Sequence, residues 1–596
     1  MKNIIFLSLF VMVLAGCDSM LDVTPKTDLT DVNFWLTEAH LKGASNRLNS
    51  LLPDRVHDFR SDEKFTEGKN AQSAGRWTLP ATSSEWTDPY RRIAEANNII
   101  ENAPKSPIDE KKRNRYLGEA LFFRAWWHFD LVCKYGDVPL ILKTFSETQD
   151  PDLKMGRTPR EEVIQQCYKD LRLAATYLPT RAEMLNISDE VERRKATRSS
   201  ALGLMVRIGL YEGTMRKFHN LSGDWQAHLD VCINAFNELK AEGHQLYTLD
   251  GAYAFLGTHL EERNNLNPET LFGKPHGPNG TGQGYNNSNY SYAIHGQVGI
   301  TRYMVDLYLY ADGLPGAKSA YYLPPADENA YNSVLGYEAD GVTPNGHPRD
   351  PRMTLTLWRE GDPDDNPDKL VAGKKIAWSA HNGTTFNHYF NETRHCPGYY
   401  QKKGHVGTLA DIYWTDNTDH NLMRWGEMLI AYAEALFERN GTISDAQLDE
   451  TVNTLRTRAG FAVKLTNAFV NANGLDMREE IRRERTVELM GENRRYNDII
   501  RWKIAEKVLP LAVVGQHLFV NTCREPPTLE ARQQACTDAN GYHKGVFVYP
   551  APNMWVFEPA SDRSFRPDRD YYYPIPTNEI AKSEGNIVQN PNWREN

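Results

Sequence analysis

The stretch RYLGEALFFRAWWHFDLVCKYGDVPLI, residues 115–141, decides the fold, because its apolar side chains occupy every side of a helix. They are Leu117, Leu121, Phe122, Phe123, Trp126, Trp127, Phe129, Leu131 and Val132. A helix that is apolar all round is buried by other elements. Residues 116–136 are therefore predicted to form a central helix, with the tryptophan pair packed in a core rather than exposed as a ligand platform.

Two polar side chains interrupt this apolar helix on a single face. Arg124 and His128 are four residues apart, which places them on the same side of a helix. A buried polar group is costly unless it has a hydrogen-bond partner. We therefore expect both residues to satisfy a buried carboxylate or carbonyl rather than to perform chemistry.

Further helical segments flank this one and arrive as adjacent pairs. A 3.6-residue apolar period predicts helices over 37–52, 86–103, 108–136, 159–178, 197–214, 225–242, 424–440, 445–459, 474–490 and 494–508. Pairing of this kind indicates helical hairpins in an α-solenoid scaffold, although no strict 34-residue repeat is present. Long stretches rich in Gly, Asn, Pro and Tyr separate them, at 53–85, 244–300, 312–423 and 510–573. Such long loops are usually functional, so we predict one mainly α globular unit that presents elaborate loops.

The N-terminus carries an export signal. Lys2 precedes an apolar run from Ile4 to Leu14, which is shorter than the roughly 20 residues that span a bilayer. Leu14-Ala15-Gly16-Cys17 has the form of a bacterial lipobox. Residues 1–16 are therefore predicted to be a lipoprotein signal peptide and Cys17 the site of lipid attachment, with membrane binding through acyl chains. The alternative is an ordinary signal peptide with an incidental cysteine.

Composition and motifs argue against several classes of function. The net charge is -10, and an acidic exported chain is a poor candidate for nucleic-acid binding. The sequence has no GxSxG, HExxH or P-loop motif and no CxxC pair, so we expect no catalytic residues, no metal and no cofactor. The acidic run 360–368 is interpreted as a solvated turn rather than a calcium loop. A disulfide between Cys523 and Cys536 is plausible in an exported protein.

A dense run of charge follows late in the chain, in REEIRRERTVELMGENRR, residues 478–495. Opposite charges four residues apart on a helix stabilise it on the surface. We therefore predict surface ion pairs such as Glu479 with Arg483, in preference to a basic docking patch.

Six segments in order resemble one protein family. They are CDSMLDVTPKTDLTDVNFW (17–35), the stretch 115–141, HPRDPRMTLTLW (347–358), RWGEMLIAYAEALFERNG with VNTLRTRAGF (424–461), EEIRRERTVELMGENRRYNDIIRW (479–502) and YYYPIPTNEIAKSEGNIVQNPNW (571–593). Together they resemble the SusD/RagB family of Bacteroidetes outer-membrane lipoproteins. One match could arise by chance, whereas six in family order are specific.

The resemblance carries expectations about fold and function. It implies four tetratricopeptide-like helical hairpins with loops and minor β structure, in one SusD-like unit over 17–596 with an N-terminal part, 17–300, and a C-terminal part, 301–596. It also implies a lipid-anchored outer-membrane protein on the surface of a Gram-negative cell. Such a protein captures a glycan and delivers it to a SusC-like TonB-dependent transporter. A peptide-capturing RagB-like member and a carbohydrate-active enzyme are the alternatives, because a glycosidase carboxylate pair has no fixed sequence spacing.

Two loops have the composition of a sugar-binding site, which needs flat aromatic faces beside amide and guanidinium groups. The first, GKNAQSAGRW (68–77), offers Asn70, Arg76 and Trp77. The second, HGPNGTGQGYNNSNYSY (276–292), offers Tyr285, Asn289, Tyr290 and Tyr292. A weaker third candidate is 310–325, with Tyr321 and Tyr322. The alternative is that these are ordinary surface loops.

Overall fold

Helices dominate the protein in the computed structural model, which describes residues 34–52, 57–66, 70–145, 150–188, 190–248, 267–274, 298–359, 398–403, 420–517 and 554–593. The longer helices are α3 (Glu38–Ser50), α4 (Ser84–Asn102), α5 (Glu110–Tyr135), α6 (Arg160–Tyr177), α9 (Arg198–His219), α10 (Trp225–Lys240), α17 (Trp425–Asn440) and α21 (Met477–Leu489). The shorter ones are α7 (Arg181–Leu185), α8 (Glu190–Arg193), α14 (Arg302–Asp306), α15 (Arg352–Thr356), α18 (Asp445–Glu450), α19 (Val452–Arg458), α20 (Asn467–Ala472), α22 (Arg495–Arg501), α23 (Ala505–Val508) and α25 (Thr577–Lys582). The predicted mainly α class is confirmed.

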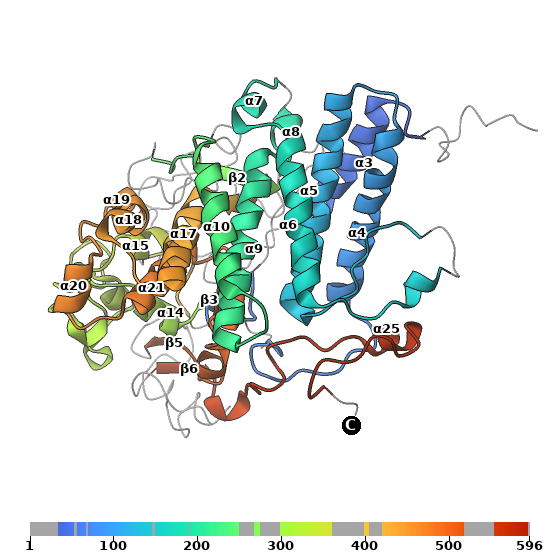
Figure 1. Ribbon diagram of the computed structural model, residues 1–596. Coiled ribbons are helices and arrows are strands. Elements are labelled where there is room, and N and C mark those ends of the chain that lie inside the picture. Colours follow the sequence, from blue (N-terminus) through green and yellow to red (C-terminus); the bar gives the residue numbers. More distant parts are fainter. Residues whose placement is uncertain are drawn as a thin grey trace, which may run out of the picture.

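The long helices lie side by side and pack in sequence order (Figure 1). α5 contacts α3, α4 and α6, α9 contacts α6 and α10, and α17 packs against α10 and α21. Close approach of α9 to α10 requires a glycine: a Cβ on Gly209 would lie 2.7 Å from the backbone nitrogen of Cys232 and from the carbonyl oxygen of His228. Successive helices therefore form the paired packing that the sequence predicts.

Local signals set the ends of the central helices. Asp109 caps α5 by accepting a hydrogen bond from the backbone N–H of Lys112 at 3.1 Å, and Gly136 ends the helix with φ 76°. Thr197 and Ser200 form a reciprocal capping box at the start of α9. These caps satisfy backbone groups that the first and last turns leave without helical partners.

Helix α5, which contains most of the stretch 115–141, belongs to the main core. Of its tryptophan pair, Trp127 is buried, whereas Trp126 is partly buried and packs against the same core beside the Arg207 guanidinium. The expectation for the two polar residues is confirmed. Arg124 forms a two-point ion pair with Asp170, and the His128 ring lies 3.0 Å from the Arg124 carbonyl oxygen.

The C-terminal segment returns to the N-terminal helices. It runs below α4 and α5, as the red trace in Figure 1 shows. The Thr577 N–H donates to the Pro80 carbonyl at 3.0 Å, and the Asn590 side-chain amide donates to the Tyr135 carbonyl at 3.1 Å. Side chains from both parts of the chain consequently share the main core.

Short strands form three separate antiparallel pairs. β1 (Lys64–Thr66) pairs with β3 (Val298–Ile300), β2 (Thr270–Lys274) with β4 (His420–Arg424), and β5 (Val513–His517) with β6 (Met554–Glu558). Each strand has three to five residues, which is too short for a clear two-residue period in the sequence. These pairs therefore appear where the sequence predicts only long loops.

Several predictions from the sequence fall outside the described residues, namely the signal peptide 1–16, Cys17, the Cys523–Cys536 pair and the acidic run 360–368. Within the described ranges, Cys133, Cys167 and Cys232 are free thiols. No helix in those ranges is long and apolar enough to cross a membrane.

Candidate functional site

The two predicted sugar-binding loops are attached at neighbouring points of the structure. The first begins after β1 and the second ends before β3, and the Cα register pairs Thr66 directly with Val298. The loops are more than 200 residues apart in the chain, yet this strand pair places their bases together. Tyr285, Asn289, Tyr290 and Tyr292 themselves lie outside the described residues.

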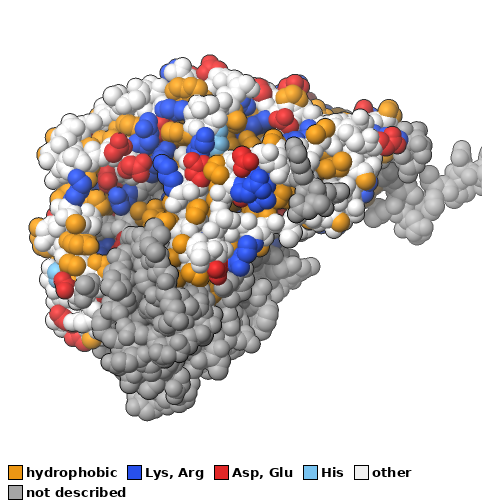
Figure 2. Space-filling view, turned by 90° about the horizontal axis from the view of Figure 1, so that it is seen from below, with side chains coloured by type: hydrophobic (Ala, Val, Ile, Leu, Met, Phe, Trp, Pro, Cys, Tyr) orange, Lys and Arg blue, Asp and Glu red, His pale blue; other side chains and the backbone are white. Residues whose placement is uncertain are grey.

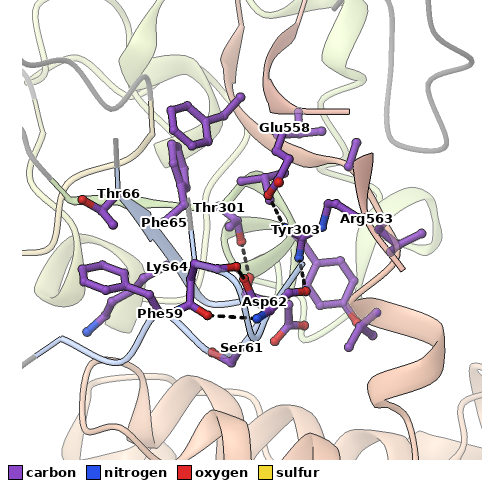
Figure 3. A pocket seen from close by; sticks show the side chains of 18 residues that line it. Phe59, Ser61, Asp62, Lys64, Phe65, Thr66, Thr301, Tyr303, Glu558 and Arg563 are labelled. Atoms are coloured by element: carbon purple, nitrogen blue, oxygen red, sulfur yellow. Dashed lines mark hydrogen bonds and ion pairs between the residues drawn. The ribbon is translucent and has the colours of Figure 1, made fainter. Parts of the chain in front are cut away.

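A cavity lies beside this strand pair, where β5 and β6 approach it (Figure 3). Its empty volume, including the mouth and open solvent, is about 620 Å³, and the enclosed space for water-sized occupants is about 40 Å³. The Phe65 ring of β1 contacts the Phe557 ring of β6, with 4.9 Å between centroids. Phe59 and Tyr303 add aromatic surface to the same wall. The sequence missed these aromatic residues because they belong to short strands, a five-residue helix and an irregular segment, none of which is long enough for a periodic signal.

The charged groups of the cavity wall are already paired with one another or with neighbouring residues, and Lys64 pairs with Glu63 at 3.4 Å. Asp62 accepts two hydrogen bonds from the Arg495 guanidinium, each at 2.8 Å. Glu558 is bound by Arg563 through one oxygen and by Arg76 through the other. Arg563 also donates to the carbonyls of Leu509 and Ser73, at 2.8 and 2.9 Å. The wall therefore offers aromatic faces and neutral polar groups in preference to free charges.

The structure places the three described residues of the first loop differently. Asn70 lines the cavity; its side-chain oxygen accepts the Ser73 N–H at 2.9 Å, and its amide nitrogen has no partner among the described residues. Arg76 reaches the rim through its ion pair with Glu558, with 46% of the side chain exposed. Trp77 is not part of the cavity lining and packs edge-on against Tyr573 and Trp593, with centroids 4.7 and 5.8 Å away. This packing accounts for Trp77 without a ligand, and sugar contact by its exposed part remains a prediction.

The third candidate loop lies apart from the cavity. Tyr321 is 40% exposed, and the Tyr322 ring lies edge-on to Tyr310 with 6.1 Å between centroids. Neither tyrosine belongs to the cavity lining.

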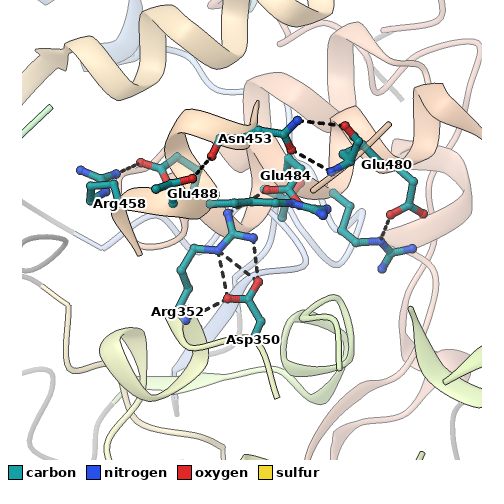
Figure 4. A network of polar contacts seen from close by, with 12 residues as sticks. Asp350, Arg352, Asn453, Arg458, Glu480, Glu484 and Glu488 are labelled. Carbon is teal, nitrogen blue, oxygen red and sulfur yellow. Dashed lines mark hydrogen bonds and ion pairs between the residues drawn. The ribbon is translucent and has the colours of Figure 1, made fainter. Parts of the chain in front are cut away.

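The predicted surface pairing of the late charge run is wrong. Glu479 pairs with Arg482 and not with Arg483, which pairs instead with Glu480. Most of the run is buried, and Glu484 lies between Arg352 and Arg456 (Figure 4), with N···O distances of 2.8 Å to each. Burial alone would raise the pKa of Glu484, but the two guanidinium groups lower it to about 2.

The surface seen from below does not carry charge of one sign, because acidic and basic side chains are interspersed on its described part (Figure 2).

This arrangement, helical hairpins with short strand pairs and a cavity beside two of those pairs, defines a class of loop-bearing α-helical scaffolds. The model of the SusD family matches residues 268–593, which is more than half of the chain. A second family model, described as "Starch-binding associating with outer membrane", matches residues 16–210. The chain belongs to the SusD family.

Relatives and solved structures agree with this assignment along nearly the whole chain. SusD-like protein P2 of Formosa agariphila is 23% identical and covers 98% of each chain. A SusD-like protein of Bacteroides ovatus is 22% identical over 84% of this chain and 82% of its own. Among solved structures, a SusD-like carbohydrate binding protein of Bacteroides fragilis superposes with a TM-score of 0.68 at 21% identity, covering 92% of this chain and 99% of its own. A laminarin binding SusD-like protein gives 0.53 at 16% identity, with 94% and 100% covered.

Proposed function

We propose that this protein is a lipid-anchored glycan-binding protein of the outer-membrane surface, which captures an oligosaccharide and delivers it to a SusC-like TonB-dependent transporter. The observation that carries the proposal is the strand register Thr66–Val298, which joins the bases of both aromatic loops beside the cavity. Membership of the SusD family, in which solved relatives are named for carbohydrate or laminarin binding, supports the ligand class. The second family description, which associates starch binding with the outer membrane, supports the location.

The chemistry of the wall favours a neutral glycan over a peptide. Capture of a peptide's charged ends or side chains would need unpaired charges, whereas Asp62, Glu558 and Arg563 are engaged with one another or with neighbouring residues. Aromatic faces beside an amide donor suit the C–H surface and hydroxyls of a pyranose. The contacts that we propose are Asn70, Arg76, Trp77, Tyr285, Asn289, Tyr290 and Tyr292.

The same pairings argue against hydrolysis at this site. A glycosidase needs two carboxyl groups, one of them protonated to act as the general acid. Both cavity carboxylates are already bound by arginine, Asp62 by Arg495 and Glu558 by Arg563, so neither stands free beside the cavity. Incubation with the oligosaccharide that binds should therefore leave it uncleaved in product analysis by chromatography.

Binding is tested by a glycan array followed by calorimetry on single variants. Stacking an aromatic ring on a sugar contributes roughly 1–3 kcal/mol at about 25 cal/mol per Å² of apolar area. Since 1.4 kcal/mol corresponds to a tenfold change, Phe557→Ala and Tyr290→Ala should each weaken binding about 5- to 150-fold. Tyr321→Ala, an exposed tyrosine outside the cavity, is the matched comparison and should leave affinity unchanged. Unchanged affinity in both Phe557→Ala and Tyr290→Ala would contradict the site.

Delivery is tested separately through the transporter. Gentle detergent extraction and pull-down of the lipidated protein should recover a TonB-dependent barrel in near-stoichiometric amount. Recovery of the protein alone, under conditions that preserve complexes of this kind, would contradict the proposed partner while leaving the glycan site standing.

A further inference from the structure

A second, smaller cavity lies within the helical scaffold, between α9, α17, α21 and α22. These helices contact one another, and α9, α17 and α21 can be followed in Figure 1. The cavity is about 20 Å³, and about 10–15 Å³ suffices for one water-sized occupant. Its polar lining comes from four arginines, two carboxylates and an amide: Arg207, Arg485, Arg494, Arg501, Glu427, Asp498 and Asn497.

The arginines around this cavity outnumber the carboxylates. Arg207 binds both oxygens of Glu427, at 2.9 and 2.7 Å, and Arg494 lies 3.9 Å from the same carboxylate. Arg501 binds both oxygens of Glu434, at 2.6 and 2.7 Å.

Asp498 pairs with two cations. It accepts hydrogen bonds from Arg485 at 3.0 and 2.9 Å and from Arg501 at 2.9 Å. Among the described residues, ion pairs join these four cations, Arg207, Arg485, Arg494 and Arg501, to three carboxylates, Glu427, Glu434 and Asp498. A fourth carboxylate, Glu492, also acts electrostatically on Arg494 and is shared with Arg424 and Lys403.

The carboxylates contribute their full negative charge. Burial by itself would raise the pKa values of Glu427 and Glu434, but arginines, with Trp502 also donating to Glu434, lower both to about 2. Glu427 is shared by Arg207 and Arg494, and Asp498 by Arg485 and Arg501, so the cations of this cluster outnumber the carboxylates that belong to it alone.

The neighbouring ion-pair network, part of which Figure 4 shows, meets this cluster at Glu492. There, the ion pairs join five cations to five carboxylates: Arg352, Arg424, Arg456, Arg458 and Lys403 with Asp350, Glu269, Glu484, Glu488 and Glu492. The two sets of ion pairs together hold nine cations and eight carboxylates, so a surplus of one positive charge remains among these described residues wherever Glu492 is counted.

One arginine at the cavity also has an N–H group without a hydrogen-bond acceptor among the described residues. Arg485 is 4% exposed and uses its Nε for both oxygens of Asp498. Its Nη1 is buried and makes no hydrogen bond among the described residues. A buried donor without an acceptor costs more when it belongs to a charged group. The surplus charge and the unsatisfied donor occur at the same place.

We propose that this cavity binds one small monovalent inorganic anion of the size of chloride. Such an ion fits the volume, accepts a hydrogen bond from Arg485 and balances the surplus charge. A water molecule would satisfy the donor and leave the charge. The ion would tie α9 and α17 to α21 and α22, so its role is to stabilise the scaffold beneath the loops, independently of which glycan binds.

The electrostatics of Arg494 agree with this assignment. Burial and the nearby Arg207 guanidinium lower the pKa of Arg494 to about 10. A bound anion beside these two cations would oppose that effect and favour the charged form.

Bromide soaking of crystals of the mature protein tests the site directly. Bromide replaces chloride and is located by its anomalous scattering. We expect a strong peak in contact with Arg485 Nη1. No peak in this cavity, or peaks on the outer surface only, would overturn the proposal and leave the cavity to water.

Melting temperature in solution gives a second readout. Binding to the folded state alone stabilises it by RT ln(1 + [L]/Kd), which for a chain of this size raises the melting temperature by about 1 °C per tenfold chloride above Kd. Sodium gluconate at equal ionic strength should not reproduce the rise. Identical melting in the two salts over a wide concentration range would refute a functional ion.

Two variants assign the effect to this cavity. Arg494→Gln removes the surplus charge and should abolish both the bromide peak and the chloride-dependent part of the melting temperature. Arg439→Gln removes an exposed arginine from its surface pair with Asp230 and should retain both. Should Arg494→Gln fail to fold, Ala431→Val, which narrows the cavity without changing charge, serves in its place. Retention of the peak in the folded variant would contradict the assignment.

Discussion

The ion pair beneath the central helix provides a sharp test of how the scaffold is held together. Arg124 on α5 donates from Nε and Nη2 to the two oxygens of Asp170 on α6, both at 2.7 Å. The two side chains are only 7% and 3% exposed, so water cannot replace a lost partner. Asp170→Asn keeps the shape and removes the charge, leaving a buried arginine that faces an amide.

The magnitude follows from burial. Removing one partner of a buried, hydrogen-bonded pair costs about 3–5 kcal/mol, because an uncompensated charge remains in the interior. Arg124 retains hydrogen bonds to the Asn97 side chain at 3.1 Å and to the Leu142 carbonyl at 3.5 Å, which places the expected loss near the lower end of that range. Replacing both partners, in Arg124→Met/Asp170→Leu, should cost less than Asp170→Asn alone because no charge is left buried.

Urea denaturation followed by circular dichroism measures all of these variants. Asp230→Asn breaks a similar arginine–aspartate pair that lies on the surface, where the side chains are 31% and 47% exposed, and should be indistinguishable from the unaltered protein. A loss below about 1 kcal/mol for Asp170→Asn, or a double variant less stable than the single one, would refute the reasoning.

Three further outcomes are expected. Burial lowers the pKa of His128 to about 3, so below about pH 6.5 the unfolded chain binds a proton that the folded chain does not. The free energy of unfolding should therefore fall on acidification by up to roughly 1.4 kcal/mol per pH unit. In urea titrations, His128→Asn should lose less stability than the unaltered protein between about pH 7 and 4.5. Cys17→Ala should shift the protein from the membrane to the soluble fraction after carbonate washing, and persistent membrane binding would contradict the lipid anchor. Trp77→Ala should lower the melting temperature through lost contact with Tyr573 and Trp593, and calorimetry on the folded variant decides whether the predicted sugar contact also exists.

The helices were accessible from the sequence because their signals are local. The period predicted 225–242 where the structure has Trp225–Lys240, and 424–440 where it has Trp425–Asn440. Capping residues and the all-round apolar surface of α5 act within a few residues of the backbone they organise. The partners of Arg124 and His128 could likewise be predicted in kind, since any buried polar group needs one.

The candidate site could be predicted only as two loops. Composition identified the segments that contain Asn70 and Tyr290. Phe59 and Phe557 were not predicted, because an irregular segment and a five-residue strand are too short to show a period. Trp77 has the composition of a platform residue, yet its ring packs against Tyr573 and Trp593 from the far end of the chain. Contacts between residues several hundred positions apart cannot be predicted from a local sequence pattern.

Charge pairing is the feature that local sequence patterns predicted least well. The sequence by itself determined the helical scaffold and the loops with sugar-binding composition, because period, capping and composition are properties of neighbouring residues. It assigned Glu479 to Arg483 by helical spacing, whereas the fold joins Glu484 to Arg352, 132 residues away, and pairs the strand ends at Thr66 and Val298. Only the tertiary structure decided these contacts, since the strength of an ion pair depends on distance in space and on exclusion of water, and both arise when distant segments pack.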